Sequence, residues 1–167
     1  MSHMTLQEFF LKQKEAVRKR TLEVLALLRP GHLTWKPEKE ALSVGEVLRH
    51  TWTSEEGVRR TALDGNFAYY ETRIPKGLSP LIGTPSSLEE ELGNIGRVHR
   101  ETLAAVAAMP AEIFETERVH AGLGFRRTVA VMLFGINEHE VHHRAQLMTY
   151  LRMLGTPAPE PFKRPSQ

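Results

Sequence analysis

Residues 137–146 read NEHEVHHRAQ and bring three histidines within five positions. Imidazole is the commonest metal ligand among side chains at neutral pH. At about 100° per residue, His143 lies near the middle of the apolar stripe of a helix and His139 within about 45° of it, whereas His142 lies about 100° away. Burying His139 and His143 without partners would cost several kcal/mol. The pair therefore predicts a metal site, with two separately hydrogen-bonded core histidines as the alternative.

A stable transition-metal site needs a third protein ligand. Helical periodicity favours His99, which lies at the centre of the apolar stripe of its own helix. His50 lies to one side of the corresponding stripe, so periodicity alone does not select it. On the residues alone the choice stays open among four candidates, which are His32, His50, His99 and His120.

His139, Glu140 and His143 also match the H-E-x-x-H pattern of a zinc peptidase helix. Such a peptidase uses the glutamate as a general base and usually takes a third ligand downstream. After Arg144 the chain has no further histidine, and its only carboxylate side chain is Glu160. The pattern therefore disfavours a peptidase. We expect Glu140 to pair with Arg144 one turn later, and the alternative role is to orient a ligand imidazole.

Four helices are expected to position these side chains. Hydroxyl caps followed three residues later by a glutamate predict helix starts at Thr5, at Ser43 and at Ser86 or Ser87. The first helix should stop at residues 29–31, the second should run from about Val44 to about Leu63, and the third should end at residues 109–110. The fourth should start near Thr128 and end at Gly155, with Pro157 close behind.

These segments predict an all-α protein, a four-helix bundle formed by a single domain over residues 1–167. Two longer connections join the helices. Residues 64–85 are rich in glycine and proline, and we expect a loop with at most a short turn. Residues 111–128 have the composition of a small hairpin around Gly122 and Gly124.

Composition excludes several classes of protein. The net charge of +2 is too small for a nucleic-acid-binding surface, and we expect the basic run at residues 12–20 to form a solvated helix face. The longest apolar run has seven residues, far fewer than the roughly 20 that a membrane span needs. His3 lies in a segment that resembles a cloning remnant, and no secretory signal is recognisable. We therefore expect a cytoplasmic protein that binds neither nucleic acid nor membrane.

The segment HEVHHRAQLMTYLRMLGTPAP, residues 139–159, resembles the C-terminal signature of the DinB-like family of damage-inducible proteins and their relatives. In that signature, two histidines one helical turn apart are followed by arginine, glycine and glutamine, and then by a leucine-rich turn, glycine and proline. Upstream, LTWKP precedes the helix that Ser43 caps and that carries His50, which is similar to the family's pattern. Ala145 stands where the family usually has glycine, and it is small enough to pack similarly.

The resemblance implies a bundle with up-down-down-up connectivity and a long crossover between its second and third helices. It also implies a divalent metal, usually zinc or nickel, bound by His50, His139 and His143. Resemblance and periodicity thus disagree over His50 and His99. We prefer His50, because a ligand at the open end of a bundle need not lie on the most apolar line of its helix.

Three imidazoles leave a coordination position open, as in catalytic metal sites. The resemblance favours a transferase that activates a low-molecular-weight thiol and acts on a small molecule. The chain has no cysteine, so the thiol would be a cosubstrate. The alternatives are a non-catalytic metal-binding or stress-response protein and a metal-dependent hydrolase. We expect a homodimer and predict no individual catalytic residue, while the residues expected to line the site are Trp52, Tyr69, Tyr70, Arg73 and Arg126.

Overall fold

Hydroxyl caps start the long helices at the residues that the sequence predicts. Thr5 and Ser43 each accept a hydrogen bond from the amide of the glutamate three residues later, and each glutamate reaches back to the cap. Ser87 and Thr128 cap through their side chains as well. The four long helices are α1 (Leu6–Leu25), α2 (Val44–Asp64), α5 (Leu88–Ala108) and α6 (Val129–Met153).

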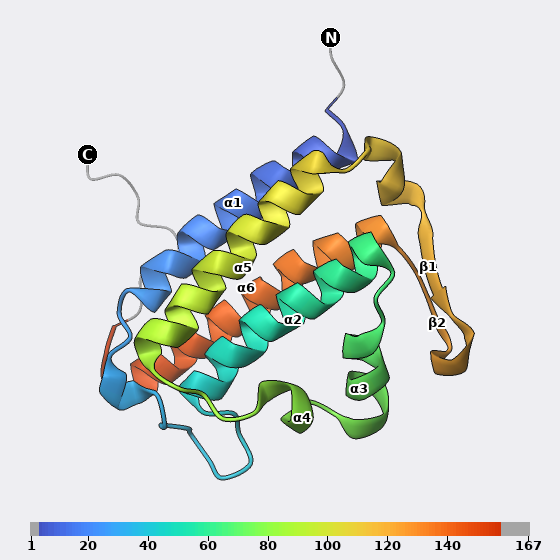
Figure 1. Ribbon diagram of the computed structural model, residues 1–167. Coiled ribbons are helices and arrows are strands. Elements are labelled where there is room, and N and C mark those ends of the chain that lie inside the picture. Colours follow the sequence, from blue (N-terminus) through green and yellow to red (C-terminus); the bar gives the residue numbers. More distant parts are fainter. Residues whose placement is uncertain (1–3, 158–167) are drawn as a thin grey trace, which may run out of the picture.

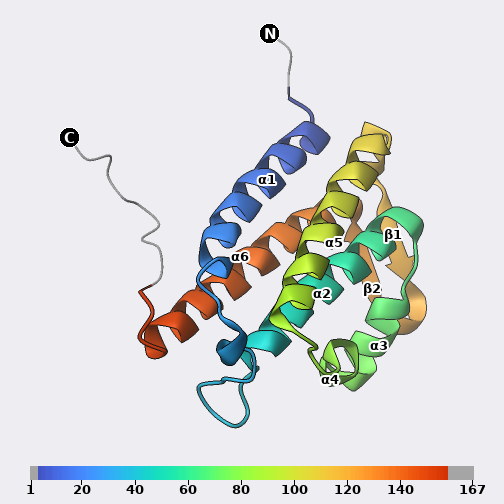
Figure 2. The same cartoon turned by 60° about the vertical axis from the view of Figure 1, so that its left-hand side comes forward.

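The computed structural model describes residues 4–157, so His3 and Glu160 lie outside the described residues. Within this range the protein is mostly helical, which confirms the all-α prediction (Figure 1). Helix α2 packs against α5 and α6, and α1 packs against α6 and α5. In Figure 1, α2 and α5 run from lower left to upper right and α1 and α6 run the opposite way, as the rotated view of Figure 2 also shows.

Two helix ends differ in detail from the prediction. Helix α1 ends at Leu25, before the expected stop at residues 29–31. The reason is that the next amides, of Leu27 and Leu28, bind carbonyls three residues back and tighten the chain out of the α-helix. At the other terminus, α6 ends at Met153 and Gly155 adopts the left-handed conformation (φ 76°) expected of it.

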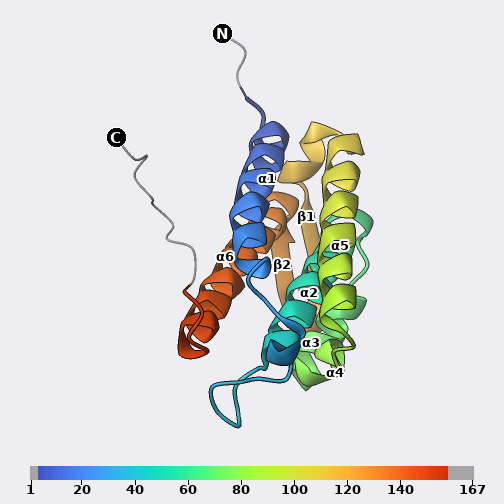
Figure 3. The ribbon, with the colours of Figure 1, turned by 90° about the vertical axis from the view of Figure 1, so that its left-hand side faces the viewer.

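The connection between α2 and α5 is not a loop, and this prediction was wrong. It contains α3 (Ala68–Lys76) and α4 (Ser79–Ile82), which lie alongside α2 (Figure 3). No residue of α3 is fully buried, and Pro75 sits within its last turn. So short a helix has no apolar periodicity long enough to be recognised. It is stabilised by packing on α2, which is a tertiary effect.

The small hairpin before α6 is confirmed. Strands β1 (Glu117–His120) and β2 (Phe125–Thr128) pair antiparallel, and Gly124 takes the left-handed conformation at the turn (φ 60°). Short 3₁₀ turns flank β1 at Ala111–Glu115 and Ala121–Leu123, and a third covers Pro30–His32. Because β2 runs directly into α6, the hairpin lies beside the start of that helix.

Two apolar clusters fill the bundle, one toward each end. The first includes Val24, Leu48, Ile95 and Leu147, and the second includes Phe10, Ala62, Val106 and Ile136. Along each long helix the chain passes from one cluster to the other, so a middle layer separates them. No helix in the described part of the chain is both long enough and apolar enough to cross a membrane.

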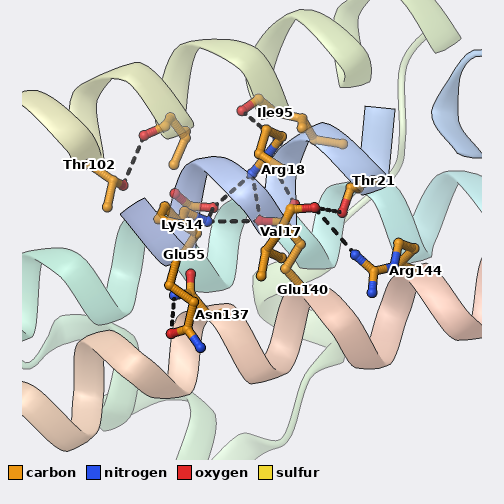
Figure 4. A network of polar contacts seen from close by, with 12 residues as sticks. Lys14, Val17, Arg18, Thr21, Glu55, Ile95, Thr102, Asn137, Glu140 and Arg144 are labelled. Atoms are coloured by element: carbon orange, nitrogen blue, oxygen red, sulfur yellow. Dashed lines mark hydrogen bonds and ion pairs between the residues drawn. The ribbon is translucent and has the colours of Figure 1, made fainter. Parts of the chain in front are cut away.

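The middle layer is a buried network of four charges (Figure 4). Lys14 Nζ lies 2.8 Å from a carboxylate oxygen of Glu55 and 2.8 Å from one of Glu140. Arg18 Nη2 contacts the same two carboxylates at 3.1 and 3.0 Å. All four side chains are at most 5% exposed. Burial raises the pKa of Glu140, but the positive charges of Lys14 and Arg18 outweigh this effect and hold that pKa below its usual value.

The network corrects two expectations. Lys14 and Arg18 belong to the basic run that was expected to be solvated, yet they are the innermost charges of α1. Glu140 was expected to pair with Arg144 on the helix surface, but its carboxylate binds Lys14 and Arg18. Arg144 instead donates a hydrogen bond to the carbonyl of Val17. Buried charges are tolerated only when they are paired. A helix face that carries cations can therefore lie in the interior when carboxylates of other helices pair with them.

Replacing Lys14 by Met should lower the free energy of unfolding by about 3–5 kcal/mol, because it removes one partner from a buried ion network and leaves Glu55 and Glu140 sharing a single cation. Lys12→Met is the matched control, since Lys12 lies on the same helix and is exposed. Urea unfolding measures both variants. A Lys14→Met loss no larger than that of the control would contradict the structural role of the network.

Candidate metal centre

Helices α2 and α6 bring three histidines together. The Nε2 atom of His139 lies 3.0 Å from Nε2 of His50 and 3.0 Å from Nε2 of His143. The nearest ring nitrogens of all three lie within 4.8 Å of one another, and in the described part of the chain no other three histidine or carboxylate side chains gather in this way. His50 comes from α2, and the two others lie one turn apart on α6.

The convergence fits a shared metal ion better than it fits hydrogen bonds between imidazoles. Each nitrogen of a neutral imidazole offers either one proton or one lone pair. Nε2 of His139 therefore cannot form good hydrogen bonds to both neighbours at once. Two nitrogens that each lie about 2.0–2.1 Å from one zinc ion at the tetrahedral angle are about 3.3 Å apart. The two observed spacings of 3.0 Å are slightly shorter than this, so the donor set fits a divalent metal after a small adjustment of the rings.

A chain of hydrogen bonds fixes the orientation of His143. Tyr150 donates its hydroxyl proton to the carbonyl of Leu42 (3.0 Å), so it accepts from the side-chain amide of Gln146 (2.9 Å). The remaining oxygen of Gln146 lies 2.8 Å from Nδ1 of His143 and can only accept. Nδ1 therefore carries the proton, and the lone pair of Nε2 points toward the other two histidines.

His50 has a comparable partner on its own helix. Its Nδ1 atom lies 3.0 Å from the hydroxyl of Ser54, which lies 2.9 Å from the hydroxyl of Tyr69 in α3. Gly57 makes this contact possible, since a Cβ there would lie 2.4 Å from the ring of Tyr69. A glycine inside a helix costs up to about 1 kcal/mol. Its presence here allows α3 to pack closely and to support the His50 ring through Ser54.

The three imidazoles are held in the uncharged form that metals bind. Burial, followed by electrostatic repulsion from His143 and Arg73 that opposes a charge on His50, lowers the pKa of His50 to about 4. Burial and the neighbouring His143 and His50 lower the pKa of His139 to about 3. Burial also lowers the pKa of His143. All three rings therefore present lone pairs at neutral pH.

The other histidines lie elsewhere. His99 is half-buried on α5, and burial followed by the charge of Arg18 lowers its pKa to about 4, but it does not join the group. His32 accepts a backbone hydrogen bond from Arg29, and His120 contacts Glu71 at 3.3 Å. His142 is exposed, as its position on the helix predicts. Helical periodicity correctly predicted that His99 faces inward, but it cannot predict which inward-facing histidines of different helices come close to one another.

A pocket of about 340 Å³ opens beside His50 and His139. Tyr69, Tyr70 and Arg73 line it, as predicted. Trp52 and Arg126 do not, and these two predictions were wrong. Trp52 donates from Nε1 to buried Glu91 (2.8 Å), which ties α2 to the start of α5. Arg126 lies on the outer face of the hairpin and pairs with Glu117.

Arg127, which the sequence did not single out, lines the pocket in place of Arg126. Neighbouring residues of a strand point to opposite faces, and only the strand register tells which of the two arginines faces the pocket. Glu140 is not free to act as the general base of a zinc peptidase, because its carboxylate binds Lys14 and Arg18. The H-E-x-x-H match is therefore a coincidence of spacing.

Comparison with known proteins finds a family and a solved structure that this chain resembles. A sequence model of the DinB superfamily matches residues 13–147. The uncharacterized protein YjoA of Bacillus subtilis strain 168 is 24% identical over 137 residues, which span 81% of this chain and 82% of that protein. A crystal structure of YjoA, described as a DinB-like protein, matches with a TM-score of 0.71 over 90% of this chain and 95% of that one, at 22% identity. At this identity the structural likeness shows the fold alone.

Replacing Ser54 by Ala should weaken metal binding by about 10–100-fold, because it removes the group that orients the His50 ring. Thr53→Ala is the control, since the hydroxyl of Thr53 contacts only main-chain carbonyls. Competition with a chromogenic chelator gives the dissociation constants. Equal affinities in the two variants would contradict the role assigned to Ser54.

Proposed function

Because the chain belongs to the DinB superfamily, we propose that it binds a divalent metal, zinc or nickel, through His50, His139 and His143. We further propose that it uses this site to transfer a low-molecular-weight thiol to a small electrophile. The observation that carries the proposal is the convergence of three Nε2 atoms beside an open pocket, which His50 and His139 line.

The pocket favours a catalytic site over a purely structural one. Structural zinc sites are closed by four protein ligands, whereas catalytic sites have three and keep a position open. Among the described residues, the group contains three ligands and no fourth. A divalent ion bound there would favour the thiolate form of a thiol at neutral pH. The pocket volume of about 340 Å³ lies at the lower end of small-molecule sites.

The side chains that line the pocket would orient a substrate and give it a partly apolar surface. Val58, Met132 and Ile136 give the pocket an apolar wall beside the histidines, and Tyr69 and Tyr70 add aromatic rings. Since the chain has no cysteine, the reacting thiol must enter as a cosubstrate. In the transfer, the thiolate sulfur forms a bond to the electrophilic carbon, the leaving group departs with its electron pair, and the thiol proton passes to solvent.

We expect one divalent ion per chain in protein purified without a metal-affinity step, and its loss in His50→Ala, His139→Ala and His143→Ala. His99→Ala and His142→Ala should retain it, because neither ring lies in the group. Elemental analysis after gel filtration gives the stoichiometry. Retention of the ion in His50→Ala together with its loss in His99→Ala would contradict the proposal, because the third ligand would then be His99 of α5 and not His50 of α2.

Thiol chemistry is tested with the cobalt-substituted and the zinc-loaded protein. Addition of cysteine, glutathione or coenzyme A to the cobalt form should change the visible spectrum, because a thiolate would enter the position that the three histidines leave open. The zinc form should accelerate the reaction of at least one such thiol with 1-chloro-2,4-dinitrobenzene, and His139→Ala should not. If the spectrum does not change and the reaction is not accelerated, the transferase proposal is rejected and a non-catalytic metal-binding protein is favoured. Turnover of ester substrates without thiol would favour a hydrolase.

A further inference from the structure

Two arginines face the pocket, and neither has a hydrogen-bond or ion-pair partner in the described part of the chain. Arg73 comes from α3 and Arg127 from β2, so two separate elements bring them to one cavity. Arg127 lies over the ring of Phe125, with 5.7 Å between the guanidinium carbon and the ring centre. Other arginines on the hairpin are engaged, since Arg118 donates to the carbonyls of Ala62 and Leu63 and Arg126 pairs with Glu117.

The acidic residues of the pocket leave these charges uncompensated. Glu55 lines the pocket, but its carboxylate already binds Lys14 and Arg18. Glu138 is exposed and forms no ion pair with any described residue. The two unpaired arginines therefore leave an excess of positive charge among the residues that line the pocket.

The remaining lining is apolar and aromatic. Besides the two tyrosines, Val58, Val131, Met132 and Ile136 line the same pocket as the arginines and His139. An occupant that satisfies every part of this surface has an apolar body and one anionic group. A guanidinium presents a fork of donors that matches the two oxygens of a carboxylate.

We infer that Arg73 and Arg127 form a carboxylate subsite, so that the substrate of the pocket is a small carboxylic acid with an apolar or aromatic body. This inference rests on the proposed function, which places the reacting end of the substrate next to the three histidines. It adds the substrate class, which the three histidines alone do not specify.

Binding of 3-phenylpropanoate and of its uncharged amide, 3-phenylpropanamide, tests the subsite. Isothermal titration of the zinc-loaded protein should give an affinity for the acid about 10–100-fold above that for the amide, in keeping with charge-assisted hydrogen bonds. Arg73→Gln and Arg127→Gln should each reduce the affinity for the acid about tenfold or more and leave that for the amide unchanged. Arg126→Gln is the matched control and should bind like the parent, and Glu138→Gln should bind the acid more tightly.

Equal affinities for the acid and the amide would overturn the inference, and so would no binding of the acid up to its solubility limit. A loss of binding in Arg126→Gln as large as that in Arg127→Gln would overturn it as well. Tighter binding of phenyl phosphate than of the acid would reassign the subsite to phosphate esters. The metal content of the same samples separates this inference from the proposed function. Metal without preference for the acid rejects only the subsite, whereas preference for the acid without metal rejects only the metal centre.

Discussion

The buried ion network is the constraint on which the candidate site depends. Lys14 and Arg18 of α1 bridge Glu55 of α2 and Glu140 of α6. Glu140 directly follows His139 in the sequence, and Glu55 directly follows Ser54, the partner of His50. Sliding α2 against α6 by one turn would leave a charge buried without its partner, at a cost of several kcal/mol. The network therefore fixes the register in which His50 meets the histidine pair, although its four charged groups form no hydrogen bond to the three described rings.

Around that register, uncharged hydrogen bonds set the direction of each ring. The series from Leu42 through Tyr150 and Gln146 fixes His143, and Ser54 with Tyr69 supports His50. Ser54 comes from α2 and Tyr150 and Gln146 come from α6, whereas Leu42 lies in the loop before α2 and Tyr69 in α3. Elements outside the pair of α2 and α6 therefore also shape the site. Catalytic groups act best when their orientation is fixed before substrate arrives. The hydrogen bonds to His50 and His143 thus orient a candidate metal donor set beside a pocket of modest size.

The sequence predicts what is local and misses what depends on tertiary contacts. The caps at Thr5 and Ser43, the turn at Gly124 and the i, i+4 pair on α6 follow from short-range geometry, and the structure confirms them. Helix α3 was missed because its stability comes from packing on α2. The burial of Lys14 was missed because its partners lie 41 and 126 residues away. His50 was chosen only through the family resemblance, since helical periodicity cannot show which residues of two helices meet.

X-ray absorption at the zinc edge of the zinc-loaded protein tests the central claim most directly, because it counts the ligands of the ion in solution. The account predicts a shell of nitrogen or oxygen atoms at about 2.0–2.1 Å with the outer-shell scattering of three imidazole rings. It also predicts no sulfur at about 2.3 Å until a thiol is added. A spectrum with one imidazole or none would contradict the account, because the three Nε2 atoms would then converge for a reason other than metal binding.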